Sequence, residues 1–182
     1  MHVDSILDLL RDNGSCAYLG EQVTQLEHAL QCATLAEEAG ESLPLVLACL
    51  LHDVGHLVRL GTEDRNAGDD GHEGIGARLL ARCLPPGVTE PIRLHVSAKR
   101  YLVANDPSYR TNLSEASMYS LEAQGGAMSA AECAQFEAEP HADDAVRLRR
   151  YDERGKTPGF ATLPLEHFEP FIHALASTMQ PE

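Results

Sequence analysis

Among the side chains of the kinds that bind transition metals, seven are the most informative: His28, His52, Asp53, His56, His72, His95 and Asp152. Imidazole and carboxylate ligands without thiolate suit borderline metals such as Fe, Mn, Zn or Co. Five or six such ligands exceed what one ion usually takes from a protein. We therefore predict a site for two metal ions, with His56 one helical turn after His52 and outside the ligand set.

The adjacent His52 and Asp53 lie in LLHDVGH, within the most apolar stretch of the chain. Neighbours on a helix point about 100° apart, so both can reach one two-metal centre if Asp53 bridges the ions. A carboxylate buried there without a partner would be costly, so it must be paired or metal-bound. Spacing alone leaves His72 equally compatible with a solvated loop residue, and Asp152 in RRYDERGK compatible with an ion-paired surface acid.

Helices must position these residues, because helical periodicity dominates the sequence. Leucines and alanines at three and four residue spacing predict a helix over 21–39, ended by Gly40. Ser42 and Pro44 open a second helix through LPLVLACLLHDVGHLV, residues 43–58, which is apolar enough to be central. The stretch 61–71, rich in Gly, Asp and Asn, is typical of a loop that delivers His72 to a helix over 73–83.

Turn and cap residues divide the second half of the chain. Pro85 to Gly87 should close one helix and Thr89 with Pro91 open the next, which carries His95 and ends at 105–107. Ser114 predicts a helix that ends at Gly125, and Ser129 with Glu132 forms a capping box. Further helices are expected over 145–152 and from Pro164 onward, where Pro170 should kink the helix or mark its start. We predict one all-α domain over residues 1–182.

The composition excludes several classes of protein. A formal charge of -14, from 28 acidic and 14 basic residues, opposes binding to a nucleic acid backbone. Five cysteines without a CxxC pair suit a reducing compartment. The start of the chain, MHVDSILDLLRDNG, does not resemble an export signal, and no apolar run approaches the ~20 residues of a membrane span. We expect a cytoplasmic protein with no nucleic acid or membrane partner; its oligomeric state is left open.

Through His28, the His52 and Asp53 pair, and Asp152, the sequence resembles the HD-domain superfamily, most of whose members are metal-dependent phosphohydrolases. The surrounding segments QLEHALQCA, LLHDVGH, HVSAKRYLV, NLSEAS, QGGAM and RYDERGK are closer to one oxidative branch. They resemble the PhnZ-type di-iron oxygenases that cleave organophosphonates. This resemblance extends from Tyr18 to Lys156 and implies an all-α HD-domain helical bundle.

The resemblance also implies roles for individual residues. The ligands of a mixed-valent Fe2+/Fe3+ pair bridged by Asp53 would be His28, His52, Asp53, His72, His95 and Asp152. Substrate would be bound at Lys99, Arg149, Ser117 and His56, and Tyr18 with Glu21 would gate the site. The implied reaction uses O2 to cleave the carbon to phosphorus bond of a 1-hydroxylated 2-aminoethylphosphonate, releasing phosphate and glycine. A trimethylated substrate would give glycine betaine.

Spacing independently supports two of the substrate residues. Lys99 follows His95 by four residues and so shares its helical face, where an ammonium would neutralise a phosphonate oxygen. Arg149 precedes Asp152 by three residues and would offer a guanidinium fork to the same anion. Ser117, early in its helix, suits either anion binding or a second capping role.

Alternatives from other functional classes remain at this point. A two-metal pair also activates water, so the same ligands suit an HD phosphohydrolase acting on a nucleotide or another phosphomonoester. A non-catalytic module that acts as a regulator by binding a phosphorylated ligand has no need of six converging metal ligands. Asp69 and Asp70 in the loop before His72 would attract an ammonium or trimethylammonium group. Because this acidic, Gly-rich loop lacks bulk, we slightly favour the trimethylated substrate.

Overall fold

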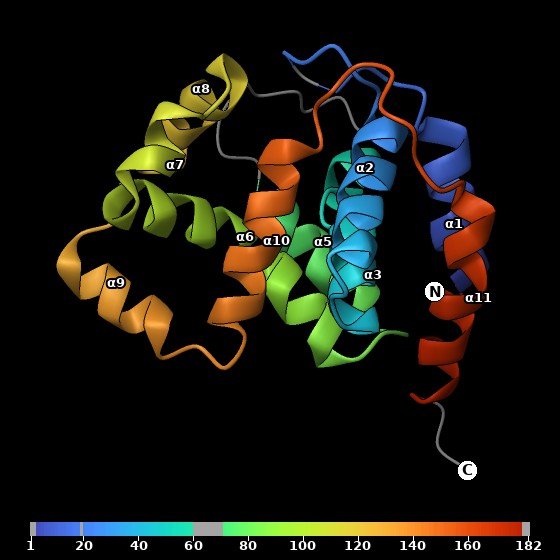
Figure 1. Ribbon diagram of the computed structural model, residues 1–182. Helices are drawn as coiled ribbons and strands as arrows, with labels where there is room; N and C mark the ends of the chain where they lie inside the picture. The colour runs from blue at the N-terminus through green and yellow to red at the C-terminus, as the bar shows by residue number, and fades with distance from the viewer. Residues whose placement is uncertain (1–2, 19, 60–70, 180–182) are drawn as a thin grey trace.

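A computed structural model describes residues 3–18, 20–59 and 71–179 of the chain (Figure 1). These residues form an all-α structure, as predicted, with a single isolated β-bridge between Ala17 and Thr24. The helices described are α1 (Val3–Asn13), α2 (Gln25–Glu38), α3 (Leu43–Leu51), α4 (Val54–Arg59), α5 (His72–Leu80), α6 (Pro86–Asn105), α7 (Pro107–Thr111), α8 (Glu115–Ala123), α9 (Ala130–Glu137), α10 (Ala142–Arg154) and α11 (Leu165–Ser177).

The apolar helix α3 forms the centre of the main core, as its composition predicts. All of its residues from Leu45 to Leu51 are buried. Helices α2, α6 and α10 pack around it, and α10 also packs against both α2 and α6. Because α2, the end of α3, α6 and α10 carry His28, His52, His95 and Asp152, the core itself draws these residues together.

Two groups of helices lie on opposite sides of this central bundle (Figure 1). Helices α1 and α11, from the two ends of the described chain, run side by side and extend the main core. Helices α7, α8 and α9 cover the other side. Two smaller clusters hold them there, one around Phe136 and Ala145 and the other around Tyr109 and Leu121.

The start of α2 differs from its prediction. The helix begins at Gln25 rather than Glu21, because Thr24 and Glu27 form a reciprocal capping box. Thr24 Oγ1 accepts from Glu27 N at 3.2 Å, and Glu27 Oε2 accepts from Thr24 N at 2.7 Å. Glu21 lies in the preceding turn, where its backbone N–H donates to the carbonyl of Tyr18. His28 consequently lies in the first turn of its helix.

The predicted helix over 43–58 is interrupted at His52 and Asp53. α3 ends at Leu51 and α4 begins at Val54. The backbone N–H of His56 donates to the carbonyl of Asp53 at 2.9 Å, which is the shorter i to i+3 turn that often joins or ends helices. The uniform apolar pattern concealed this break, since both short helices bury the same residue types.

Other boundaries shift by a few residues. α5 starts at His72 itself, after Gly71 in the left-handed conformation (φ 60°), so His72 belongs to the helix rather than the loop. α6 starts at Pro86, because proline is favoured in a first helical turn, and not at Thr89. α11 continues through Pro170. Most of the predicted loop, including Asp69 and Asp70, lies outside the described residues.

Among the helices that the structure describes, none is both long and apolar enough to cross a membrane.

Candidate metal centre

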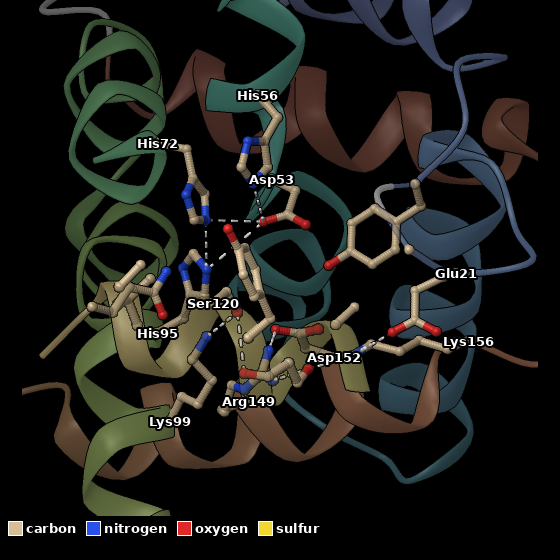
Figure 2. Close-up of a pocket in the computed structure, with 18 of the residues that line it drawn as sticks. Glu21, Asp53, His56, His72, His95, Lys99, Ser120, Arg149, Asp152 and Lys156 are labelled. Carbon is tan, nitrogen blue, oxygen red and sulfur yellow. Dashed lines mark hydrogen bonds and ion pairs between the residues drawn. The ribbon is translucent and has the colours of Figure 1, made fainter. Parts of the chain in front are cut away.

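The side chains predicted as metal ligands converge at one buried position. His28 and His52 are fully buried, and His95 and Asp152 are 3% and 1% exposed. Figure 2 shows Asp53, His56, His72 and His95 directed toward the space that Lys99, Arg149 and Asp152 approach from below. Folding therefore unites residues that are separated by more than a hundred positions in the sequence.

One half of the cluster contains His28, His52 and Asp152. The Nε2 atoms of His28 and His52 are 3.2 Å apart. His28 Nε2 lies 3.5 Å from Asp152 Oδ1, and His52 Nε2 lies 3.7 Å from Asp152 Oδ2. Asp53 faces this half with Oδ2, at 3.4 Å from His52 Nε2.

The other half contains His72 and His95, whose Nε2 atoms are 3.1 Å apart. Asp53 faces this half with its second oxygen, Oδ1, at 3.3 Å from His72 Nε2 and 3.7 Å from His95 Nε2. His56 Nε2 lies 4.0 Å from the same oxygen, and its ring stacks on His72. One carboxylate thus offers an oxygen to each half, the arrangement expected of a bridging ligand.

Backbone carbonyls orient three of the imidazole rings. The Nδ1 atoms of His28, His52 and His95 lie 2.9, 2.8 and 2.8 Å from the carbonyl oxygens of Gly155, Cys49 and Ile92. Because a carbonyl only accepts, each Nδ1 carries a proton and each neutral ring turns an unprotonated Nε2 inward. The facing Nε2 atoms of His28 and His52 therefore have no proton to share, and a bound cation would relieve their repulsion.

The carboxylates show a matching lack of partners. Asp53 Oδ2 and Asp152 Oδ1 are buried and, among the residues described, have no hydrogen-bond partner. Two donors that bind one ion at about 2.1 Å, roughly at right angles, lie about 3 Å apart. The separations between the Nε2 and carboxylate oxygen atoms of this cluster are close to that value. Buried oxygens and nitrogens with unused lone pairs have the composition and spacing of a metal-binding cluster.

Electrostatics keep these groups in the forms that bind metal. Burial lowers the pKa of His28 to about 3 and also lowers the pKa values of His52 and His95. Burial alone would raise the pKa of Asp53, but the facing histidines hold it well below its usual value. These three imidazoles are therefore neutral and the Asp53 carboxylate is ionised at neutral pH, which are the forms that bind a metal.

Cys32 lies beside the cluster without joining it. Its Sγ is 3.8 Å from both ring nitrogens of His28 and donates to the carbonyl of Tyr151 at 3.6 Å. Burial raises the pKa of this thiol well above its usual value. Its proton is donated to a backbone carbonyl, and the nearer donors facing His28 and His52 are the nitrogen and oxygen atoms described above.

A cavity of about 460 Å³ opens onto this cluster of histidine and aspartate side chains, called the metal cluster below. Its walls come from the turn before α2, from α6 and α8, and from the end of α10. The lining residues that carry polar groups are Tyr18, Glu21, Gln25, Asp53, His56, His72, His95, Lys99, Ser117, Tyr119, Ser120, Gln124, Arg149, Asp152 and Lys156. A small molecule in this cavity would touch Asp53, His72 and His95 directly.

Comparison with known proteins decides the family. The HD domain family matches residues 26–123, a span that includes His28, His52, Asp53, His72 and His95. The chain belongs to the HD-domain family. Among its curated relatives is the [1-hydroxy-2-(trimethylamino)ethyl]phosphonate dioxygenase (glycine-betaine-forming) of Leisingera caerulea. That protein is 41% identical over 180 residues, which cover 95% of this chain and 89% of the relative.

A second relative shares the same general chemistry. The hydroxymethylphosphonate dioxygenase of Gimesia maris is 44% identical over 169 residues, covering 91% of this chain and 84% of the relative. Both relatives are named as dioxygenases of phosphonates, and both match this HD-domain protein over most of its length. The chain is accordingly an enzyme of the HD-domain family.

Three cationic side chains line one wall of the HD-domain cavity. Arg149 is 4% exposed; its guanidinium donates to Tyr109 Oη at 2.7 Å, to Glu153 Oε2 at 2.7 Å and also to Asp152. Lys156 Nζ donates to Ser117 Oγ at 2.8 Å. Lys99, the third, donates to Ser120 Oγ at 2.8 Å.

Lys99 carries the most perturbed charge of the three. Burial, followed by the charges of Arg149 and Lys156, lowers its pKa to about 7. Among the residues described, the ammonium is therefore poorly compensated. An anion in the cavity would offset this cost, so the charge and burial of the wall suit a phosphate-like group.

Tyr18 and Glu21, predicted to act as a pair, have different surroundings. The Tyr18 ring stacks on His28, with centroids 4.1 Å apart, and burial and the charge of Asp53 raise its pKa. Glu21 turns away from the metal cluster: its carboxylate accepts from Ser114 Oγ at 2.6 Å and lies 3.5 Å from Lys156 Nζ. Both residues line the cavity.

Sequence reasoning missed several residues of the site. Lys156 and Glu153 lie in the segment RYDERGK, and their position within one turn of Asp152 was the available signal. Ser120 lies three residues after Ser117 on the same face of α8. Gly55, in LLHDVGH, brings α4 against the start of α5, since a Cβ there would lie 2.0 Å from the carbonyl oxygen of His72.

Proposed function

We propose that this HD-domain enzyme is a non-heme di-iron oxygenase that cleaves the carbon to phosphorus bond of a 1-hydroxylated phosphonate. The proposed substrate is (1-hydroxy-2-(trimethylammonio)ethyl)phosphonate, giving glycine betaine, or its amino counterpart, giving glycine. One observation carries the proposal: a buried wall of three cations faces the same cavity as the metal cluster. The names of the two relatives support the same chemistry.

The reaction balances with O2 as the only co-substrate. The 1-hydroxyphosphonate and O2 give a carboxylate, hydrogen phosphate and one proton. The carbon to phosphorus and carbon to hydrogen bonds of C1 are broken, and both atoms of O2 end in the products. The organic carbon and the phosphorus together lose four electrons, which O2 accepts.

In this proposal the metal ions are held by the buried cluster. His28, His52 and Asp152 would hold one iron, His72 and His95 the other, and Asp53 would bridge them through its two oxygens. Nitrogen and oxygen donors without thiolate suit iron that must change oxidation state. When bound, the irons would supply the activation of O2 and the polarisation of the substrate hydroxyl.

The cationic wall would bind the phosphonate group. Lys99 and Arg149 are aimed at the cavity from α6 and α10, and Lys156 lies beside Ser117. Together they would offset the two negative charges of a phosphonate, and after cleavage they would stabilise the phosphate. His56, next to the His72 and His95 half, would contact the substrate at its reacting end.

Aromatic side chains would receive the organic end. Tyr18 and Tyr119 both line the cavity, and Tyr119 is 69% exposed. The face of an aromatic ring attracts an ammonium or trimethylammonium group within about 6 Å. A substrate with its phosphonate on Lys99 and its cationic end toward these rings would span the cavity.

The test is O2 consumption by protein loaded with iron under reducing conditions. The substrates are the trimethylammonio, amino and unsubstituted hydroxymethyl phosphonates, with phosphate and the carboxylic acid measured as products. We expect one O2 consumed per phosphate released, and fastest turnover of the trimethylated or amino substrate. If hydroxymethylphosphonate is turned over faster, the proposed carbon to phosphorus bond cleavage stands. The proposal that the substrate carries an amino or trimethylammonio group is then wrong.

A phosphomonoester assay with Mn, Co or Zn provides the contrast. Hydrolysis of a nucleotide or sugar phosphate without O2, combined with no O2 uptake on any phosphonate, would contradict the oxygenase and favour a phosphohydrolase. Anaerobic incubation of the iron-loaded enzyme is the matched control and should release no phosphate.

A further inference from the structure

We infer that Glu153 is the positioning residue of the anion-binding wall. It would hold Arg149, Lys156 and Ser117 in the geometry that receives the phosphonate. The inference rests on the proposed function insofar as the anion is a phosphonate or the phosphate product. It concerns a residue next in sequence to the proposed ligand Asp152. The two carboxylates share Arg149 as a donor, but the other partners of Glu153 are Ser114, Ser117 and Lys156.

Four donors converge on the Glu153 carboxylate. Oε2 accepts from Arg149 Nη2 at 2.7 Å, Ser117 Oγ at 2.9 Å and Lys156 Nζ at 3.1 Å. Oε1 accepts from the backbone N–H of Ser114, the N-cap of α8, at 2.8 Å. A single side chain therefore links α10, the segment after it and the start of α8.

Glu153 lies behind the cavity wall. Arg149, Lys156 and Ser117 line the cavity, whereas Glu153 is not among the lining residues. Its side chain is 12% exposed. An anion in the cavity would thus meet the groups that Glu153 holds without meeting Glu153 itself, which is why we assign a positioning role.

The charge of Glu153 makes this arrangement stable. All four of its partners donate to the carboxylate, and two of them, Arg149 and Lys156, are cations, so its surroundings favour the ionised form. The carboxylate is therefore ionised and separates two buried cations that would otherwise repel each other. Without it, Arg149 and Lys156 would have to reorganise before an anion binds.

The hydroxyl of Ser117 is oriented by Glu153. Its proton is donated to Glu153, and its oxygen accepts from Lys156 at 2.8 Å and from Arg149 Nη2 at 3.2 Å. Ser117 is thus held with its lone pairs toward the two cations. The hydroxyl fixes their spacing, and an anion would find both cations already oriented.

The experiment compares Glu153→Gln with the wild-type metal-loaded enzyme. Affinity for inorganic phosphate is measured by calorimetry, and KM and kcat are measured separately with the phosphonate. The amide presents N–H donors to side chains that are themselves donors. We expect phosphate affinity to fall about tenfold or more and KM to rise by a similar factor, with metal content unchanged.

Glu115→Gln is the matched control. It makes the same change of charge at an exposed position in the first turn of α8, so it reports any general effect on that helix terminus. Its phosphate affinity should remain within twofold of wild type. Glu153→Asp keeps the charge with a shorter reach and should restore part of the affinity; it also carries the test if the amide variant does not fold.

The outcomes separate this inference from the proposed function. A folded Glu153→Gln enzyme that binds phosphate and phosphonate within twofold of wild type overturns the positioning role, as does a wild-type enzyme that binds no phosphate. If the wild-type enzyme consumes no O2 with any phosphonate, yet phosphate affinity is lost in Glu153→Gln and retained in Glu115→Gln, the oxygenase proposal fails and the inference stands.

Discussion

His52 and Asp53 are neighbours in the chain whose side chains face each other, with His52 Nε2 3.4 Å from Asp53 Oδ2. Consecutive residues in a regular helix point about 100° apart. The turn between α3 and α4 allows both to reach the same centre. This turn also leaves Asp53 Oδ1 directed toward His72, so the carboxylate lies between the two halves of the cluster.

Asp53→Asn should remove metal from both halves. The amide keeps the size of the carboxylate but loses its charge and cannot bridge two cations with two anionic oxygens. Elemental analysis should show a fall from about two ions per chain to well below one. Asp106→Asn, which changes a carboxylate that caps α7 instead, should keep the wild-type metal content. Two ions per chain in Asp53→Asn would argue against bridging.

Gly55→Ala should selectively disturb the half that contains His72. The added Cβ would lie 2.0 Å from the carbonyl oxygen of His72 and would push the start of α5 away from α4. We expect metal content to fall by about one ion per chain and oxygenase activity to be lost. Gly74→Ala is the control within α5, because its nearest contact is the flexible end of Arg78 at 3.2 Å. Equal metal content in both variants would contradict this role of Gly55.

Thr24→Ala should weaken both the stability of α2 and the retention of metal. The capping box starts α2 one turn before His28, and its loss should cost about 1 kcal/mol of unfolding free energy. We also expect weaker metal retention during dialysis against a chelator, because the first turn of α2 carries a ligand. Ser129→Ala removes the equivalent capping box of α9, far from the cluster, and should lose similar stability with no change in metal retention.

The pKa of about 7 for Lys99 predicts the pH dependence of substrate binding. The ammonium that binds the anion is lost as pH rises through 7, so kcat/KM for the phosphonate should fall on the alkaline side. Lys99→Arg stays charged throughout and should shift this fall to higher pH. Steady-state rates from pH 6 to 9 provide the measurement, and identical profiles for both enzymes would exclude Lys99 as the titrating group.

The same group affects stability with a defined sign. Its pKa in the folded chain lies below the usual value of 10.5, so the unfolded chain binds more protons between these pH values. The contribution of Lys99 therefore makes the folded enzyme more stable as pH rises from 7 to 10.5. Denaturant unfolding at several pH values measures this effect. Between pH 7 and 10.5 the unfolding free energy should rise more steeply with pH for wild type than for Lys99→Met.

Local patterns in the sequence predicted much of this protein. The cap residues Ser114 and Ser129 begin helices where expected, because a cap bonds only to backbone within three residues of itself. The apolar run of α3 predicted the central helix. The scattered histidines and aspartates predicted a common centre, because this number of nitrogen and oxygen donors suits two metal ions and a carboxylate in an apolar helix needs a partner.

The tertiary structure alone decided the remaining features. The break at His52 and the approach of Gly55 to His72 depend on how α4 packs against α5, which an apolar pattern does not encode. The convergence of Arg149, Lys156 and Ser117 on Glu153 joins helices that are distant in sequence, and its energy comes from distances of about 3 Å between buried groups. Residue types and spacing determined which chemistry the chain can support, whereas long-range packing decided which oxygen faces which nitrogen.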